Sequence, residues 1–549
     1  MKSASFLATF SFFLSFTLPA QQPSWQHPPK LVVGIVVDQM RTDYIYRYWD
    51  NFGDGGFKRL IGDGAFLRDA HYNYMPTVTG PGHASIYTGT TPSHHGIVAN
   101  DRYDRTTRKT IYCTMDMDAN AVGTAPGNAH RSPVQLLSTT LADELERRTE
   151  RRSKTIGVAL KDRSSILPIG RTGDAAYWMY GTEGSFITST WYMKQLPQWV
   201  IDFNGKKPAE QYLAQTWSLA LPVERYHQVL PDDNPYEIPL YRGVRPSLPL
   251  NLDSLRKAGA GLDLISYTPW GNTITTDMAL AALKGEQMGA DAITDLLAIS
   301  YSSTDILGHR MGPRAVEVED MYIRLDRELK RLLDELDKSV GAGQYTVFLT
   351  ADHGAVDVPQ YLKDLRGSAG YVDQTQLADS LNYWYRSNED SLAVWEGQVF
   401  VVKRAIPLQH TLTGAYIQQD RMMVGQLMKD PGVYRAWTSS DLRTAAPDGD
   451  DLTTWVRNGF MPQRSGDVLF VMRPGHFELE EWSNGHGTTH GSPWTYDTHV
   501  PILFYGAGVQ HTEVLRRTHI TDIVPTISAI VGMSLTDACT GRVVDEVVK

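Results

Sequence analysis

The sequence predicts an α/β fold in which one mostly parallel sheet is sandwiched by helices and carries two inserted cap regions. Continuous apolar runs rich in Val and Ile are typical of strands that a sheet buries on both faces. Four such runs span residues 30–37, 154–160, 295–301 and 345–350. Stretches with helical spacing of apolar residues separate them, and this alternation favours parallel strands joined by helices.

The length and charge of the chain limit what it can be. Its 549 residues suffice for two to four domains or for one large α/β domain with insertions. With 13 Trp and 27 Tyr, most of the chain is expected to build a packed core. The formal net charge of −10 argues against nucleic acid as a partner, because nucleic-acid binding proteins present a basic surface.

The N-terminus predicts export. A lysine at position 2, an apolar run from Phe6 to Leu18 and a small residue at Ala20 are typical of a signal peptide covering residues 1–20. A membrane anchor is the alternative, but the run is shorter than the ~20 residues that a span needs. No later stretch is long and apolar enough to cross a bilayer. A periplasmic or secreted location follows.

Helices are expected between the strands of the first part of the chain. Residues 39–47 and 57–61 have helical character. Ser132-Pro-Val-Gln135 has the pattern of a capping box with proline at the first helical position. The helix that it would open carries one apolar face, formed by Val134, Leu137, Leu141 and Leu145.

The second part of the chain alternates regular and irregular stretches. Helices are predicted near 278–288 and over 318–336, where apolar residues form a single stripe. Residues 190–275 and 357–464 lack the alternation, so we expect them to be the inserted caps. The predicted core closes with strands at 466–472 and 499–505 and a last helix near 522–531.

A turn around Thr79 is the centre of the functional prediction. Thr79 precedes Gly80, Pro81 and Gly82, and helix-compatible residues follow. This order is typical of a strand-to-helix turn with a hydroxyl residue at the cap and proline just inside the helix. A helix N-terminus attracts phosphate through its free N–H groups. The alternative is that Thr79 only caps the helix.

Side chains of the kind that bind metals follow several of the predicted strands. Asp38, Asp305 with His309, and Asp352 with His353 lie near strand ends that one edge of a parallel sheet would gather. Together with a late histidine, this mixture of carboxylate and imidazole suits two Zn²⁺ ions. Two such ions can activate one oxygen and stabilise another during in-line displacement. The activated oxygen would be that of Thr79. Cysteine-based zinc sites are excluded, because the chain has two Cys, and whether Cys113 and Cys539 pair is left open.

These residues lie in five motifs that resemble one family. The motifs are Val36-Val-Asp-Gln-Met40, Pro76-Thr-Val-Thr-Gly-Pro-Gly-His83, Ser303-Thr-Asp-Ile-Leu-Gly-His309, Ala351-Asp-His-Gly354 and Thr488-Thr-His-Gly-Ser-Pro493. They resemble the alkaline phosphatase superfamily, in particular its nucleotide pyrophosphatase/phosphodiesterase-like branch and the periplasmic monoesterases with a threonine nucleophile. The resemblance covers about residues 31–532 outside the irregular stretches. It implies an alkaline-phosphatase-like catalytic domain over residues 21–549.

The resemblance also implies the metal ligands. One zinc would bind Asp38, Thr79, Asp352 and His353, and the second would bind Asp305, His309 and a late histidine. Both His486 and His490 precede a glycine. His490 fits the family pattern better than His486 because Ser-Pro follows it, and His499 fits less well than either. His83, His94 and His95 have no carboxylate in register and are interpreted as loop or helix-start residues.

Three more residues are candidates for contacting the phosphoryl group. The family places an amide at the position of Asn100 and a Lys-x-Arg pair at Lys161 and Arg163. The simpler interpretations are a turn residue for Asn100 and a solvated rim for the two cations.

The resemblance implies a zinc-dependent phosphomonoesterase that acts through a phosphothreonine on exported or extracellular small-molecule monoesters. A monomer is expected. A phosphodiesterase or nucleotide pyrophosphatase on the same scaffold is the first alternative, and transfer to an acceptor other than water is a second. A phosphate- or glycan-binding protein without activity is another, but it would require a broken ligand set and every position is present.

Overall fold

The computed structural model describes residues 28–241, 243–245, 247–384, 392–395, 399–402, 414–445, 451–479, 483 and 485–549. The predicted signal peptide lies outside these residues. Within them, every helix is too short or too polar to cross a membrane. Cys113 and Cys539 are not joined in a disulfide: Cys113 Sγ lies near Gly80 at the start of one helix, and Cys539 Sγ lies near Gly89 at its end.

The described part of the chain builds a central sheet of ten strands. Their order is β21-β2-β20-β13-β1-β12-β7-β8-β9-β6. In that order they span Thr512–Val514, Ala65–Leu67, Ile502–Gly506, Tyr345–Thr350, Leu31–Val37, Asp295–Tyr301, Thr155–Ala159, Ala175–Tyr180, Ser185–Ser189 and Ala121–Val122. The five strands from β13 to β8 are parallel, whereas β20 pairs antiparallel with β13 and β9 pairs antiparallel with β8. The predicted fold class is confirmed.

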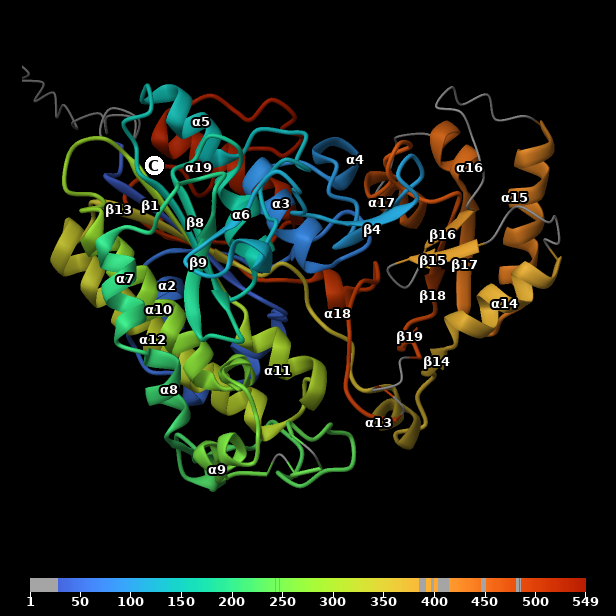
Figure 1. Cartoon of the computed structure of the whole chain (residues 1–549), viewed down its shortest axis with the longest axis horizontal. Helices are drawn as coiled ribbons and strands as arrows, with labels where there is room; N and C mark the ends of the chain where they lie inside the picture. Colours follow the sequence, from blue (N-terminus) through green and yellow to red (C-terminus); the bar gives the residue numbers. More distant parts are fainter. Residues whose placement is uncertain are drawn as a thin grey trace, which may run out of the picture.

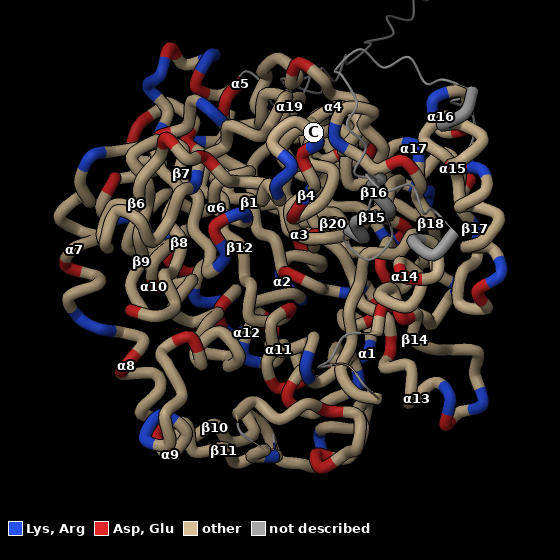
Figure 2. The backbone as a smooth tube through the Cα atoms, turned by 45° about the vertical axis from the view of Figure 1, so that its right-hand side comes forward, with Lys and Arg blue, Asp and Glu red and all other residues tan. Residues whose placement is uncertain are grey.

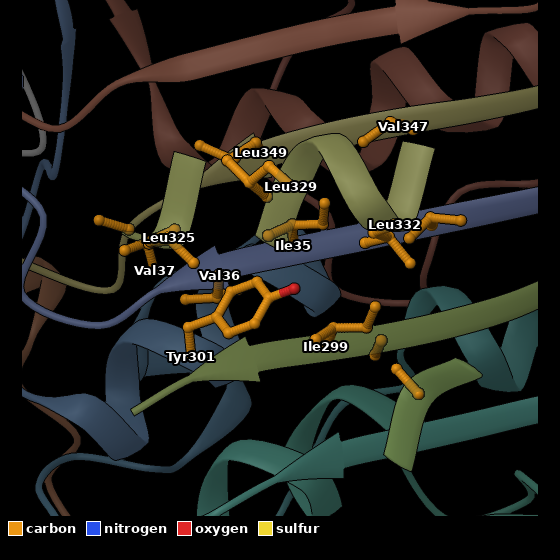
Figure 3. Packing of buried hydrophobic residues seen from close by; sticks show 14 of the residues in the cluster. Ile35, Val36, Val37, Ile299, Tyr301, Leu325, Leu329, Leu332, Val347 and Leu349 are labelled. Carbon is orange, nitrogen blue, oxygen red and sulfur yellow. The ribbon is translucent and has the colours of Figure 1, made fainter. Parts of the chain in front are cut away.

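Apolar side chains of neighbouring strands and one long helix form the centre of the core. All seven residues of β1 are buried, because helices cover both faces of the sheet. Helix α12 spans Val316–Leu336, and its Leu325, Leu329 and Leu332 pack over β1 and its neighbours (Figure 3). Burying each leucine stabilises the fold by about 1.5–3 kcal/mol.

Helices cover the two faces of this sheet (Figure 1). Helices α3 (Thr79–Thr88), α5 (Leu141–Arg148), α6 (Asp162–Ile169) and α19 (Ile523–Val531) lie on one face. Helices α7 (Gln198–Gly205), α10 (Pro269–Gly285) and α12 lie on the other. The remaining short helices of this part are α1 (Asp43–Arg47), α2 (Phe57–Gly62), α4 (Pro92–His95), α8 (Pro208–Leu213), α9 (Leu252–Lys257), α11 (Ser303–Met311) and α18 (Thr495–Thr498).

Short strand pairs accompany the main sheet. They are β3 (Ala70–His71) with β22 (Thr518–His519), β4 (Asp101–Asp104) with β5 (Lys109–Tyr112), β10 (Thr216–Trp217) with β11 (Leu250–Asn251), and β14 (Gly370–Val372) with β19 (His476–Glu478).

A second sheet stands beside the first (Figures 1 and 2). It has the order β15-β16-β18-β17 and is antiparallel. Its strands span Leu392–Trp395, Val399–Val402, Val468–Met472 and Val433–Thr438. Helices α14 (Gln374–Trp384) and α15 (Gly414–Leu427) pack against it, and α13 (Pro359–Asp364), α16 (Ser439–Thr444) and α17 (Leu452–Asn458) complete this region.

One strand prediction is wrong in its location. The apolar run at 466–472 was expected to close the main core, but it forms β18 of the second sheet. Val468 and Phe470 pack on Leu427 in one small core, while Leu469 and Val471 pack in another. A strand buried on both faces has the same apolar pattern in either sheet, so the pattern alone cannot assign it.

The helix predicted to open at Ser132 is also wrong. Helix α5 begins at Leu141, where Thr140 and Asp143 form the capping box. Val134 and Leu137 are 39% and 49% exposed, so they do not extend its buried face. The Leu137 N–H instead donates to the carbonyl of His95, and this contact holds the segment as a turn.

Candidate active site and metal centre

The carboxyl ends of four neighbouring parallel strands, β13, β1, β12 and β7, meet at one edge of the central sheet. Asp38 follows β1 directly, and Asp352 follows β13 by two residues. Asp305 lies in the first turn of α11, the helix that begins after β12, and Lys161 lies between β7 and α6. The topology thus gathers charged side chains from distant parts of the sequence, as ligand sites in open α/β sheets do.

Asp38, Asp352 and His353 form the first group of metal-type side chains. His353 Nε2 lies 3.5 Å from Asp38 Oδ1 and 3.5 Å from Asp352 Oδ2. All three residues are fully buried, and one donor atom from each lies within 4.8 Å of the others. Donor atoms this close can share one ion.

Asp305, His309 and His490 form the second group. Asp305 Oδ1 lies 3.1 Å from His309 Nε2 and 3.5 Å from His490 Nε2. The ring of His490 stacks on that of His353 with centroids 3.4 Å apart, so the two groups adjoin. His486 lies elsewhere: its Nδ1 pairs with the carbonyl of Pro235 at 2.7 Å.

Lys161 links the two groups. Its Nζ lies 2.6 Å from Asp38 Oδ2 and 2.5 Å from Asp305 Oδ2. The side chain is 10% exposed, and the two carboxylates raise the pKa of its ammonium despite the opposing effect of desolvation. Lys161 therefore keeps its charge at the centre of the site and does not lie on a solvated rim.

Thr79 is the first residue of α3, and its hydroxyl points into the site. Val78 occupies the cap position, so the hydroxyl of Thr79 is not used for capping. Thr79 Oγ1 lies 3.5 Å from His353 Nε2 and 3.4 Å from Arg163 Nη2. The simple capping interpretation is therefore wrong, and the hydroxyl lies between a metal-type group and a cation.

Asn100 lies beside the start of the same helix. Its Oδ1 accepts a hydrogen bond of 2.8 Å from the N–H of Gly80. With the carbonyl end of the amide used in this way, the Nδ2 end is the one left to donate.

Arg163 is held by residues that the sequence did not indicate. Its Nη1 donates to the hydroxyl of Tyr112 at 3.0 Å, and that hydroxyl donates to Asp162 Oδ1 at 2.6 Å. Arg131 also pairs with the carboxylate of Asp162. Neither Tyr112 nor Arg131 is near Arg163 in sequence, so no local pattern could have indicated this support.

Gln39 is a second residue that sequence reasoning missed. Its Nε2 donates to Asp305 Oδ1 at 2.7 Å, and its backbone N–H donates to Asp352 Oδ1 at 3.2 Å. It adopts a left-handed φ of 64°, which aims both groups into the site. A Cβ at Gly308 would lie 2.1 Å from Gln39 Oε1, so the glycine leaves room for this side chain. The available signal was its place directly after Asp38 in the first motif.

His83 lies in α3, as expected of a helix-start residue, but its ring is closer to a carboxylate than the sequence indicated. Its Nδ1 lies 3.4 Å from Asp352 Oδ2 and 2.9 Å from the carbonyl of Thr79. Burial lowers its pKa to about 3, so the ring is neutral. One turn of helix separates Thr79 from His83, and this spacing brings the ring under Asp352. His94 and His95 lie away from the site, and His95 pairs with Ser85.

The charges of the two groups fit divalent cations. Asp38 Oδ1 and Asp352 Oδ2 are buried and have no hydrogen-bond partner among the described residues. Burial and neighbouring carboxylates raise the pKa of Asp38 and Asp352. Burial acts in the same direction on Asp305, but His309 and Lys161 outweigh it and hold its pKa well below the usual range. Because burial and His490 keep His353 neutral, its Nε2 is available as a ligand.

The family follows from comparison with known proteins. A family model described as type I phosphodiesterase / nucleotide pyrophosphatase matches residues 32–493. The chain belongs to this family. This confirms the resemblance that the five motifs indicated.

Relatives in this family match the chain almost from end to end. Alkaline phosphatase PafA of Elizabethkingia meningoseptica is 39% identical over 543 residues, 97% of each chain. Alkaline phosphatase PhoV of Synechococcus elongatus is 36% identical and covers 97% of this chain and 95% of its own. The crystal structure of wild-type PafA superposes with a TM-score of 0.89, at 38% identity over 95% of this chain and 99% of that one.

Proposed function

We propose that this chain is an alkaline phosphatase, a hydrolase of phosphate monoesters with Thr79 as its nucleophile. The position of Thr79 Oγ1 carries the proposal: it lies 3.5 Å from His353 Nε2 and 3.4 Å from Arg163 Nη2. A nucleophile thus adjoins both a metal-type group and a cation that can bind a phosphoryl oxygen. The relatives named as alkaline phosphatases support the reaction class.

Two zinc ions per chain would complete the site. The proposed ligands are Asp38, Thr79, Asp352 and His353 for one ion, and Asp305, His309 and His490 for the other. Neutral imidazole and carboxylate are usual ligands of zinc, which supports this choice over magnesium or calcium. When bound, the ions would lower the pKa of the Thr79 hydroxyl and offset the charge of the phosphoryl oxygens.

The residues of the chain then perform an in-line displacement in two steps. Thr79 gives its hydroxyl proton to water as Oγ1 attacks phosphorus, the bond to the ester oxygen breaks, and the leaving alkoxide takes a proton from water. A phosphothreonine results. Water attacks it from the opposite side, the bond between phosphorus and Oγ1 breaks, and phosphate leaves while Thr79 recovers its hydroxyl.

Arg163 and Asn100 would hold the phosphoryl oxygens during both steps. The guanidinium can donate hydrogen bonds to two oxygens at once. Its orientation is fixed by a hydrogen bond to the hydroxyl of Tyr112, which in turn donates to Asp162. The Nδ2 group of Asn100 would donate to a third oxygen, since its Oδ1 is held by Gly80. Lys161 would contribute a positive charge between the metal sites.

The balance of charge favours a monoester over the alternative, a diester. A monoester carries two negative charges on three free oxygens, whereas a diester carries one charge and has an alkylated oxygen. Each charge-assisted contact is worth about 1.5–3 kcal/mol. Contacts from Lys161 and Arg163 would thus favour the dianion by a few powers of ten, at about 1.4 kcal/mol per tenfold.

Comparison of an aryl phosphate with its methyl ester tests this proposal. We expect a much larger kcat/KM for the monoester, and we expect the double change Lys161→Ala with Arg163→Ala to reduce monoester hydrolysis far more than diester hydrolysis. The change Arg171→Ala, on the surface away from the site, serves as the control. Equal losses on both substrates would mean that the two cations only shape the site, and the phosphodiesterase alternative would then be the better one.

The same proposal includes export and small-molecule substrates. The signal-like residues 1–20 support a periplasmic or secreted location for a chain of residues 21–549, and N-terminal sequencing of the exported protein tests this. Figure 2 shows basic and acidic positions interspersed over the molecule, which supports small phosphomonoesters over nucleic acid as substrates. We infer a monomer.

A further inference from the structure

His83 is a fully buried histidine whose ring contacts three different parts of the site. It lies one turn after Thr79 in α3. Its Nδ1 lies 2.9 Å from the carbonyl oxygen of Thr79 and 3.4 Å from Asp352 Oδ2. Its Nε2 lies 2.9 Å from the hydroxyl of Ser300, in the central strand β12. The ring takes no part in the reaction steps proposed for Thr79.

The Nδ1 of His83 must be the donor in its contact with Thr79, because a carbonyl oxygen can only accept a hydrogen bond. The same N–H lies near Asp352 Oδ2, which has no hydrogen-bond partner among the described residues. The distance of 3.4 Å exceeds that of a good hydrogen bond, but the positive end of the N–H dipole still stabilises a nearby carboxylate oxygen. One N–H group therefore connects the backbone of Thr79 with the side chain of Asp352.

The residue before His83 brings the same two segments together. A Cβ on Gly82 would lie 2.6 Å from the carbonyl oxygen of Asp352 and 3.0 Å from its Cα. The start of α3 therefore packs against the backbone of Asp352 at a distance that only glycine permits. Gly82 sets how closely the helix approaches, and His83 supplies the polar contact between the helix and this aspartate.

We propose that His83 is a positioning residue, which fixes the hydroxyl of Thr79 relative to Asp352. It acts through the Thr79 carbonyl and does not touch the substrate. The inference rests on the proposed function, in which Thr79 attacks phosphorus and shares one metal ion with Asp352. A reacting atom that is misplaced by about 1 Å can lower a rate by about 100-fold, so a contact that holds both residues in register affects the chemical step.

The alternative is that His83 only fills space in the core, and His95 provides the comparison. His95 is also fully buried, and it also contacts α3: its Nε2 lies 2.9 Å from the hydroxyl of Ser85. Its Nδ1 accepts from the N–H of Ile97 at 3.1 Å, outside the site. If burial alone mattered, equivalent changes at the two histidines would have equivalent effects.

Two amide substitutions separate the contacts of the two ring nitrogens. The side-chain nitrogen of asparagine lies as far from the backbone as Nδ1 of histidine, so His83→Asn keeps a donor for the Thr79 carbonyl. That of glutamine lies as far out as Nε2, so His83→Gln keeps the contact with Ser300 and loses the one with Thr79. Both variants bury one amide, and their losses of stability should be similar. The change His95→Gln is the matched control.

Steady-state kinetics of the full-length, zinc-saturated protein on an aryl phosphate test the proposal. We expect His83→Gln to lower kcat at least about tenfold, the lower end of the range for residues that orient metal ligands. Its KM should stay near that of the parent, because the lost interaction acts on the attacking oxygen and not on substrate binding. The variants His83→Asn and His95→Gln should keep kcat and KM within about threefold of the parent, although buried substitutions of this kind lower the melting temperature.

Competition with a chelator for zinc gives a second measurement that does not depend on activity. The variant His83→Gln should release one of its two zinc ions at a chelator concentration about tenfold lower than the parent does, whereas His83→Asn and His95→Gln should match the parent. Equal losses of kcat in the two His83 variants, or parent-like kcat and zinc retention in His83→Gln, would overturn the proposal. A parent that hydrolyses no phosphate ester would instead refute the proposed function, so the two failures are distinguishable.

Discussion

At the scale of single residues, the hydroxyl of Thr79 lies between the first group of metal-type side chains and the guanidinium of Arg163. It lies beside His353 of the first group, and Arg163 approaches it from the side of α6. A threonine hydroxyl is a weak nucleophile by itself, so its position beside metal-type ligands is what gives it a chemical role.

Replacement of Thr79 tests that role. The change Thr79→Ser keeps the attacking oxygen and should retain much of the activity, whereas Thr79→Ala removes the oxygen and should lose most of it. Steady-state rates on an aryl phosphate measure both, with zinc content as the control for an intact site. A Thr79→Ala variant nearly as active as the parent would show that water attacks the substrate directly.

The sequence predicted that the aspartates of the candidate metal site lie close together, because the carboxyl ends of parallel strands lie at one edge of the sheet. Asp38, Asp305 and Asp352 followed from that rule alone. Gln39 and Tyr112 did not, since their contacts join segments far apart in the chain and depend on side-chain orientation. No pattern of spacing encodes such contacts.

At the scale of elements, α5 shows how two capping signals compete. Both Ser132-Pro-Val-Gln135 and Thr140 with Asp143 resemble helix starts, and the chain uses the second. The Asp143 carboxylate accepts from the backbone N–H groups of Thr140, Arg171 and Thr172. The N–H groups of Arg171 and Thr172, in the loop after α6, favour the second helix start, and a local sequence pattern could not reveal these contacts.

The change Asp143→Ala should therefore destabilise the protein strongly. It leaves three backbone N–H groups without their acceptor, and each unsatisfied buried group costs about 1–3 kcal/mol. We expect a loss of at least about 3 kcal/mol in the free energy of unfolding, measured by urea denaturation. The change Gln135→Ala, in the unused signal, should cost under about 1 kcal/mol. The reverse ranking would contradict the assignment of the helix start.

At the scale of the whole molecule, buried carboxyl groups make stability depend on pH. Glu146 is almost fully buried, its Oε1 accepts from Thr155 at 2.8 Å, and burial followed by the charge of Asp174 raises its pKa to about 7. An unfolded chain has a glutamate pKa of about 4.3. The folded state thus binds this proton more tightly, and the stability that it contributes is lost as pH rises toward and through 7.

The change Glu146→Gln removes this titration. Relative to the parent, the variant should gain stability between about pH 5 and pH 8, by on the order of 2 kcal/mol. Urea unfolding at several pH values measures the difference, and the exposed Glu150→Gln provides a control that should show no such trend. If the difference between the Glu146 variant and the parent did not change with pH, the raised pKa would be refuted.

The whole fold was more predictable from the sequence than its division into sheets. Alternating strands and helices predicted the parallel centre, because each buried strand has a distinctive apolar run. The run that forms β18 has the same composition, and only its tertiary partners place it in the second sheet.

The metal content of the purified, full-length protein tests the central claim most directly. Mass spectrometry should find two zinc ions per chain, and chelation should abolish hydrolysis of an aryl phosphate until zinc is restored. The change Asp352→Ala should lower both zinc content and activity. The loss should exceed the roughly 10–100-fold that is typical when a residue hydrogen-bonded to a metal ligand is replaced. Full hydrolytic activity in protein shown to be free of metal would contradict the account.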